Sequence, residues 1–188
     1  MLDLHDREWK DFRLLDYFRH EKGNQNNMAE LRPGAFPLVS ARNANNGYKD
    51  FVSENEKKHS FEGFCLTINN DGDGGAGISY YQPCKMLLDS HVTALYPKAS
   101  MTEEILKFFS ACITAQREKL SIFSWGGNGA TLTRLRRSKI MLPVDESGNP
   151  DYAFMEQYIK ERERQIVQSY IDYTSENIQM GGSASDIE

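Results

Sequence analysis

A basic stretch between a glycine-rich turn and a short apolar segment carries the side chains best suited to hold an anion. Its members are Arg134, Arg136, Arg137 and Lys139, with no acidic residue among them. A guanidinium group can donate two parallel hydrogen bonds to a guanine edge or to a phosphate. Alternate residues of an extended segment share a face, so Arg134 and Arg136 would point the same way. The alternative is a solvated strand edge whose charges only prevent aggregation.

Small polar side chains in the preceding turn add candidate contacts. Asn128, Thr131 and Thr133 suit base edges or phosphates, although such residues populate loops of every kind. We expect Trp125 to anchor this turn rather than to stack on a nucleic acid.

An asparagine-rich turn forms a second candidate site, whose members are Arg42, Asn43, Asn45, Asn46 and Lys49. Asn46-Gly47 is a strong turn signal because both residues tolerate positive φ. An asparagine amide can pair with adenine through two hydrogen bonds, and a tight turn would push such side chains outward. A plain hairpin tip is the alternative.

The glycine-rich sequence NDGDGGAG carries two aspartates but lacks the twelve-residue pattern and closing glutamate of a calcium loop. It also lacks the Lys-Ser/Thr of a phosphate-binding loop. We therefore predict a structural turn between two strands. Tyr80, Tyr81 and Gln82 follow the turn and can face a nucleic acid, and Lys57, Lys58 and His59 are weaker candidates for phosphate contacts.

Signals for catalysis are missing from the sequence. Its four histidines show no HExxH or other metal-ligand spacing. No GxSxG or Cys-His signature of a nucleophilic enzyme, no Asn-Pro-Pro-Tyr type motif of a methyltransferase and no acidic nuclease cluster stands out. Cys65, Cys84 and Cys112 lack CxxC spacing, and we interpret them as buried thiols. We expect a non-enzyme that binds no metal or cofactor itself.

The elements that would position these residues predict an α+β fold with a mixed, mostly antiparallel sheet and a covering helix. Gly23 to Asn27 is expected to be loop, with turns at 33–37 and 146–150. Ser100 and Glu103 have capping-box spacing and predict the start of a helix that ends near Leu120. The strands are expected at 9–14, passing into a helical turn, and at 36–41, 51–52, 64–69, 78–82, 91–96 and 140–144.

A long charged helix is predicted from Asp151 to about Asn177. Its apolar stripe runs along roughly 38 Å and calls for a partner helix; the stripe comprises Met155, Ile159, Ile166, Tyr170 and Tyr173. Residues 145–188 hold ten acidic and three basic side chains of the 27 and 22 in the chain, so the net charge of -5 divides into -7 there and +2 in the rest. Overall acidity is thus no argument against a local anion-binding face.

No apolar run approaches the roughly 18 to 20 residues that span a bilayer, and the first ten residues are too charged for a signal peptide. We expect a cytoplasmic protein.

Several segments, taken in order, resemble one family. They are EWKDFRLLDYF, PLVSARNANNGYKDFV, FCLTINNDGDGGAGISYYQ and FSWGGNGATLTRLRRSKIMLPVDESGNPD, followed by the long helix. Together they resemble a target-recognition domain of the DNA specificity (S) subunit of type I restriction-modification enzymes, or of the related type IIG-like systems. The resemblance covers roughly residues 7 to 178.

The resemblance implies a recognition domain at 1–150 and a spacer or dimerisation helix at 151–178 that pairs antiparallel with a second such helix. The composition of GGSASDIE predicts a disordered tail at 179–188. The resemblance also implies double-stranded DNA as ligand. Catalysis would lie in partner subunits: methyltransferase subunits with S-adenosylmethionine and, where a nuclease subunit is present, Mg and ATP.

One recognition domain instead of the usual two implies a half-subunit that dimerises or a fragment of a longer protein. A homodimer would read an interrupted palindrome. A scaffold or anti-restriction protein of the same fold that binds no DNA is the alternative reading.

Overall fold

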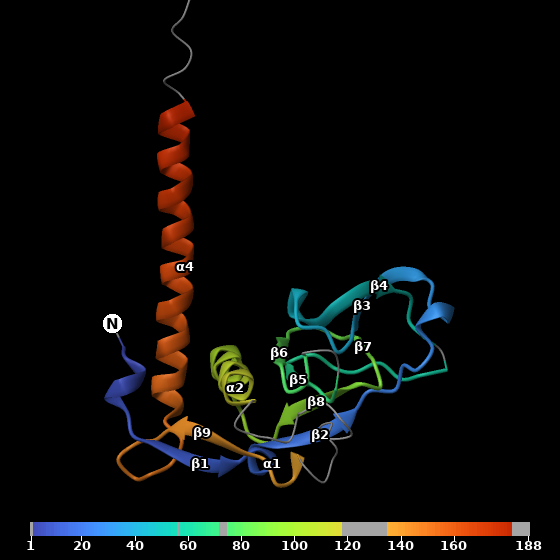
Figure 1. Cartoon of the computed structure of the whole chain (residues 1–188), viewed down its shortest axis with the longest axis horizontal. Helices are drawn as coiled ribbons and strands as arrows, with labels where there is room; N and C mark the ends of the chain where they lie inside the picture. Colours follow the sequence, from blue (N-terminus) through green and yellow to red (C-terminus); the bar gives the residue numbers. More distant parts are fainter. Residues whose placement is uncertain (1, 56, 72–74, 118–134, 182–188) are drawn as a thin grey trace, which may run out of the picture.

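The computed structural model describes residues 2–55, 57–71, 75–117 and 135–181. It consists of a packed α+β body from which one long helix, α4 (Tyr152–Gly181), projects at one end (Figure 1). Three small sheets form the body, and α2 lies between α4 and the largest of these sheets. The short 3₁₀ helices are η1 (Leu4–Asp6), η2 (Met28–Glu30) and η3 (Asn45–Gly47).

The central sheet has four antiparallel strands in the order β2-β8-β5-β6. The strands are β2 (Phe18–Lys22), β8 (Val92–Pro97), β5 (Cys65–Asn69) and β6 (Ser79–Gln82). Every residue of β5 is buried, because it lies between two strands and both faces of the sheet are covered. The predicted hairpin at 64–69 and 78–82 is confirmed. β2 was not predicted, since its sequence FRHEK is that of a polar edge strand.

Helix α2 (Glu103–Gln116) covers this sheet with a face that includes Phe108, Phe109 and Ile113. Its cap is Thr102, whose hydroxyl accepts a hydrogen bond from the Ile105 amide at 3.4 Å. The prediction that Ser100 begins the helix is therefore wrong by two residues. At the other end of α2, the Thr114 hydroxyl bonds both backbone groups of Ser79 in edge strand β6.

Strands β1 (Trp9–Arg13) and β9 (Lys139–Pro143) form an antiparallel pair beneath α4 and α2. The short helix α1 (Leu14–Tyr17) connects β1 to β2, as the predicted strand and helical turn required. The strand predicted at 140–144 is confirmed as β9, which ends at Pro143, and the turn that follows is closed by Gly148 at a φ of 80°.

The third sheet has the order β4-β3-β7, with β3 (Pro33–Val39), β4 (Tyr48–Val52) and β7 (Leu87–Leu88). The predicted turn at 33–37 is wrong, because these residues belong to β3. β7 pairs only with Leu38 and Val39. Pro33 and Pro37 therefore lie where β3 has β4 as its one neighbour and its other edge is free, which tolerates a residue without an N–H donor. A register shift between Pro33 and Phe36 accommodates Gly34 and Ala35.

The first turns of α4 are part of the body. Phe154 and Met155 are buried in the main core, and the Phe108 ring lies 5.7 Å from the Tyr158 ring. Lys107 of α2 contacts Glu163 at 2.6 Å, which makes the junction with α2 partly electrostatic.

The predicted apolar stripe on this helix therefore divides. Met155 is 0% exposed, so the expectation that it contacts a partner helix is wrong, whereas Ile159 is half-buried against the same core and its contact with a partner helix stays a prediction. The helix also continues to Gly181, beyond the predicted end at 177–178. The predicted disordered tail otherwise falls at 182–188, outside the described residues.

The cysteines correct one more expectation. Burial raises the pKa of the Cys65 and Cys112 thiols to about 12, whereas Cys84 is exposed. The described residues include no group of three or more His, Cys, Asp or Glu side chains that could hold a metal. Within the same residues, no helix has the length and apolarity needed to span a membrane.

Candidate nucleic-acid interface

The tip of the β3–β4 hairpin has a conformation that few sequences adopt. Asn45, Asn46 and Gly47 all have positive φ, at 53°, 53° and 78°. Asparagine and glycine are the residues that tolerate this region best, which explains the Asn-Asn-Gly sequence. The predicted turn is thus confirmed, as the η3 element.

Buried amide side chains hold the backbone of this tip. Asn69, at the end of β5, donates from Nδ2 to the Arg42 carbonyl at 2.9 Å, and Gln82 of β6 donates from Nε2 to the Asn46 carbonyl at 3.0 Å. Both side chains are 1% exposed. A buried amide that loses its hydrogen bond costs free energy, so these contacts stabilise the position of the tip on the central sheet.

Four of the predicted side chains are left exposed around this fixed backbone: Arg42, Asn43, Asn45 and Lys49. In the described part of the chain, no hydrogen bond or ion pair involves the side chain of any of them. They combine positive charge with amide donors and acceptors on a rigid support. Such groups can contact phosphates and base edges.

Asn46 differs from the prediction. Its Nδ2 donates to the Tyr81 carbonyl at 3.0 Å, so its amide fastens the tip to β6. Gln82 also differs, since it faces the interior and cannot reach a nucleic acid in this conformation.

Tyr80 lies beside the hairpin, in a groove of about 710 Å³ between β6 and α2. Burial raises the pKa of its hydroxyl. A methyl group placed on Gly47 would lie 3.4 Å from the Tyr80 ring, so the ring supports the tip from beneath. The groove is lined by Asn46, Ser79, Tyr80, Tyr81, Pro83, Glu103, Lys107, Ser110, Ala111, Thr114 and Ala115.

The basic stretch that comprises Arg134, Arg136, Arg137 and Lys139 is described only from residue 135 onward. Arg136 and Arg137 are exposed in a turn closed by a hydrogen bond from the Ser138 amide to the Leu135 carbonyl at 3.2 Å. The prediction of an extended segment is therefore wrong at these two residues, because buried Leu135 and Ser138 anchor a turn. Trp125, Asn128, Thr131, Thr133 and Arg134 lie outside the described residues.

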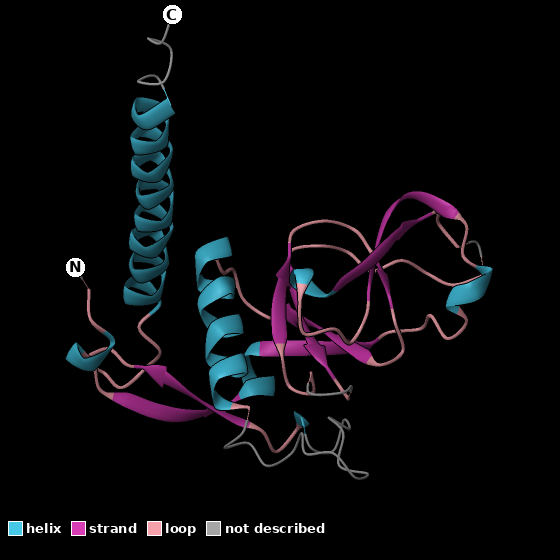
Figure 2. Cartoon of the chain, turned by 45° about the horizontal axis from the view of Figure 1, so that its top comes forward, coloured by secondary structure: helices cyan, strands magenta, loops and turns pink. Residues whose placement is uncertain are grey.

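The two basic sites lie apart. The turn at 135–138 adjoins the start of β9, whereas the tip of the β3–β4 hairpin is hydrogen-bonded to β5 and β6, on the far side of α2 from α4 (Figure 2). Among the described residues, no hydrogen bond or ion pair connects the two. Lys139, next to the turn, is 3.8 Å from Asp11 across the β1–β9 pair.

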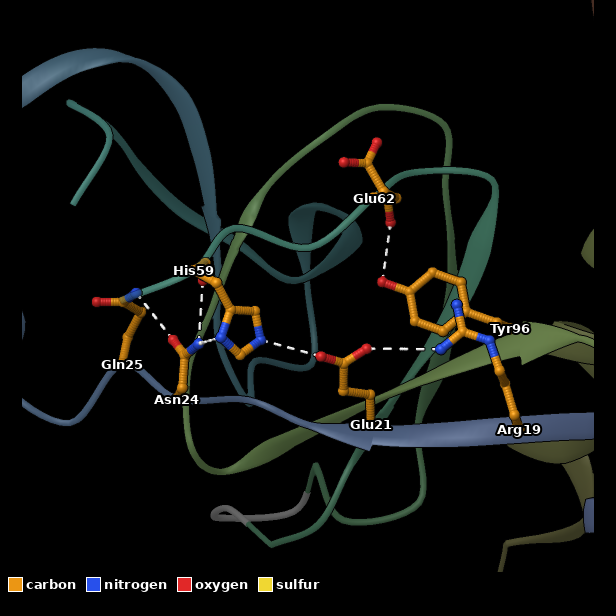
Figure 3. A network of polar contacts seen from close by, with 7 residues as sticks. All are labelled: Arg19, Glu21, Asn24, Gln25, His59, Glu62 and Tyr96. Atoms are coloured by element: carbon orange, nitrogen blue, oxygen red, sulfur yellow. Dashed lines mark hydrogen bonds and ion pairs between the residues drawn. The ribbon is translucent and has the colours of Figure 1, made fainter. Parts of the chain in front are cut away.

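A polar network elsewhere in the body contains His59, one of the weaker candidates (Figure 3). Its Nε2 lies 2.9 Å from the Glu21 carboxylate, and its Nδ1 lies 3.1 Å from the Asn24 amide nitrogen. Glu21 also contacts Arg19, whose guanidinium lies 4.0 Å above the Tyr96 ring. These side chains bind one another and join the loop after β2 to the loop before β5.

The distal half of α4 presents the other exposed surface. Ile166, Tyr170 and Tyr173 are 70%, 68% and 66% exposed. Val167 and Ile171, which the predicted stripe did not include, are exposed beside them. A water-exposed apolar surface on a projecting helix is typical of a helix that packs against another protein.

Comparison with known proteins agrees with this geometry. A family model described as the type I restriction modification DNA specificity domain matches residues 6–169. The chain belongs to this family. The match includes the hairpin, the central sheet and the first half of α4.

A relative from Heyndrickxia coagulans is the specificity subunit S.BcgI of a type II restriction enzyme. It is 30% identical over 168 residues, which are 87% of this chain and 46% of the relative. The chain therefore spans about half the length of this curated relative.

Two crystal structures have the same fold. One is the type I restriction-modification S subunit from M. genitalium, with a TM-score of 0.60, 17% identity and coverage of 93% of this chain and 44% of that chain. The other is the HsdS subunit from Thermoanaerobacter tengcongensis, with a TM-score of 0.58, 14% identity and coverage of 85% and 38%.

The supporting amides were missed by the sequence reasoning. Asn69 ends an apolar strand, FCLTIN, and a polar residue at such an end is a weak signal because loops begin there too. Gln82 ends the paired strand and was interpreted as facing outward. Only the register of β5 against β6 and the position of the hairpin above them show that both amides point at the same tip.

Proposed function

We propose that this chain recognises a sequence in double-stranded DNA as the specificity component of a restriction-modification complex. The observation that carries the proposal is the hairpin tip, whose exposed Arg42, Asn43 and Asn45 stand on a backbone fixed by buried amides. Membership of the DNA specificity domain family supports the same function.

A rigid tip suits discrimination between bases. A bidentate contact between arginine and guanine, or asparagine and adenine, contributes about 1–3 kcal/mol against the wrong base. That difference is obtained only if the donors and acceptors are already in place, because a mobile loop loses conformational entropy on binding. Lys49 and the exposed Arg136 and Arg137 would contribute phosphate contacts that set affinity and register.

The distal half of α4 would pair with a second specificity helix, supplied by another copy or by the remainder of a longer protein. The helix has 30 residues, about 45 Å at 1.5 Å each, so a pair of such helices can separate two DNA-reading domains. A homodimer would read an interrupted palindrome, since a symmetric protein demands a symmetric site.

Catalysis is proposed to reside in partner subunits. A methyltransferase subunit would bind S-adenosylmethionine, and a nuclease subunit, where present, would use Mg and ATP. For this chain we propose neither a catalytic residue nor a bound cofactor. Its role would be to direct the partners to the target.

Selection from a pool of randomised DNA duplexes tests the proposal. The full chain is purified with the methyltransferase subunit of its host, and bound duplexes are sequenced over several rounds. We expect enrichment of one interrupted motif. Binding that depends on salt but enriches no sequence would contradict sequence recognition, because phosphate contacts alone carry no sequence information.

A further inference from the structure

Asn69 lies between two loops and holds both. Its Nδ2 donates to the Arg42 carbonyl at 2.9 Å and to the Gly75 carbonyl at 3.2 Å. A primary amide has two N–H donors, and here each serves a different loop. The side chain is 1% exposed, so it does not reach the surface on which a DNA duplex would lie.

The two loops touch at this point. A methyl group placed on Gly75 would lie 3.4 Å from Asn69 Nδ2 and 3.7 Å from the Ala41 carbonyl oxygen. The backbone at Gly75 is therefore packed against residues 41–42 of the loop that joins β3 to β4, with the Asn69 amide between them.

The support beneath Asn69 is rigid. Its backbone pairs with Ile78 and Gly77 at 2.9 Å each, and the next residue, Asn70, bonds the His91 carbonyl of the neighbouring segment at 2.8 Å. The Asn70 side chain accepts a hydrogen bond from the buried Thr93 hydroxyl at 2.8 Å. The position of the Asn69 side chain thus follows from the central sheet.

We propose that Asn69 is a positioning residue for DNA recognition: it fixes the direction in which Arg42, Asn43 and Asn45 leave the body, and so it determines specificity without contacting DNA. This inference rests on the proposed function. Base-edge contacts require groups held within about 0.5 Å of their working positions, and a freed Arg42 carbonyl would turn toward water and take the tip with it.

The test compares Asn69→Ala with Asn70→Ala, which removes the adjacent buried amide that bonds Thr93 and not the hairpin. Each full-length variant, purified with the host methyltransferase subunit, is titrated with a duplex selected by the wild type and with a scrambled duplex of equal composition. Asn69→Ala is expected to weaken specific binding about 10- to 100-fold and to leave scrambled-duplex binding and its salt dependence unchanged. Asn70→Ala is expected to change the ratio of the two affinities less than about threefold. Equal losses on both duplexes would overturn the proposal.

A combined variant separates positioning from loss of stability. If Asn69 acts through the hairpin, Asn69→Ala should have little further effect on specific binding in an Arg42→Ala/Asn43→Ala/Asn45→Ala background, because the side chains that Asn69 positions have been removed there. Additive losses would contradict a positioning role. Where Asn69→Ala does not fold, Asn69→Ser keeps one donor and is expected to give a smaller loss in the same direction.

Hydrogen exchange provides a readout that needs no DNA. The Ser40 amide donates to the Gly47 carbonyl at 2.9 Å and closes the hairpin tip. In Asn69→Ala this amide should exchange at least about tenfold faster, with no such change in Asn70→Ala. If the wild type selects no DNA sequence, the proposed function fails while exchange still reports whether Asn69 holds the tip. Unchanged exchange would refute the structural part of the inference.

Discussion

Two exposed parts of the molecule, the distal half of α4 and the tip of the β3–β4 hairpin, have opposite chemistry. The helix exposes Ile166, Tyr170 and Tyr173, whereas the hairpin exposes Arg42, Asn43 and Asn45. Each is anchored at its base by buried side chains, aromatic for the helix and amide for the hairpin. The difference indicates two classes of partner: an apolar protein surface for the helix and a polar, anionic ligand for the hairpin.

The base of the helix should be the most sensitive point. Met155→Ala removes a fully buried side chain between α4 and the body and is expected to lower the free energy of unfolding by about 2–5 kcal/mol. Ile166→Ala, on the exposed half, should change it by less than about 0.5 kcal/mol. Urea unfolding of both variants measures the difference. Similar losses would show that the two halves of α4 do not differ as described.

The exposed half should govern assembly instead of folding. Ile166→Glu places a charge in the proposed helix interface and is expected to abolish helix pairing, with an unfolding midpoint close to that of the wild type. Gln168→Glu adds the same charge about 200° around the helix from Ile166, at an exposed position, and should leave pairing intact. Light scattering of the chain, alone and with the methyltransferase subunit, reports the mass. An Ile166→Glu protein that assembles like the wild type would remove the interface.

At the hairpin, substitution should change DNA binding without affecting assembly. Arg42→Ala is expected to cost about 1–3 kcal/mol on the selected duplex and much less on a scrambled one, if the guanidinium reads a base. Lys22→Ala, an exposed lysine on β2, serves as the control for loss of one positive charge. Fluorescence anisotropy titrations measure both. Equal losses on the two duplexes would make Arg42 a phosphate contact.

The smallest effect is expected from pH, near the start of the glycine-rich loop. A hydrogen bond to Asp71, at 2.9 Å, raises the pKa of His91 above its ordinary value near 6.5. The pair therefore contributes stability below that ordinary value, and the contribution is lost as pH rises through the raised pKa. Both groups are largely exposed, so we expect about 0.2–1 kcal/mol. Urea unfolding near pH 5.5 and pH 8.5 should show this difference in the wild type and not in His91→Gln. An identical pH dependence in the two proteins would contradict it.

The sequence predicted the parts of the fold that local patterns determine. Asn-Gly favours turns because both residues tolerate positive φ, and the hairpin at 64–69 and 78–82 is bounded by glycines, so both could be predicted from the sequence alone. The charged strand β2 could not, because it is a strand through its pairing with β8 and not through its own propensity.

The candidate site was predicted for its exposed residues and not for its supports. Arg42, Asn43, Asn45 and Lys49 are recognisable by residue type next to a turn. Asn46 and Gln82 have the same chemistry but are used internally, and only tertiary packing decides between the two uses. Met155 and Ile166 likewise belong to one periodic stripe. Met155 is buried because the body packs against the first turns of α4, whereas Ile166 lies beyond the body and is exposed.

The most direct test of the account is the pattern of DNA methylation directed by this chain. The chain and the host methyltransferase subunit are expressed in cells that lack them, and methylated bases are mapped across the genome. The account predicts one interrupted motif with the wild type, and a relaxed or lost motif with Asn43→Ala/Asn45→Ala although the complex still assembles. The same motif from both proteins would contradict recognition by the hairpin.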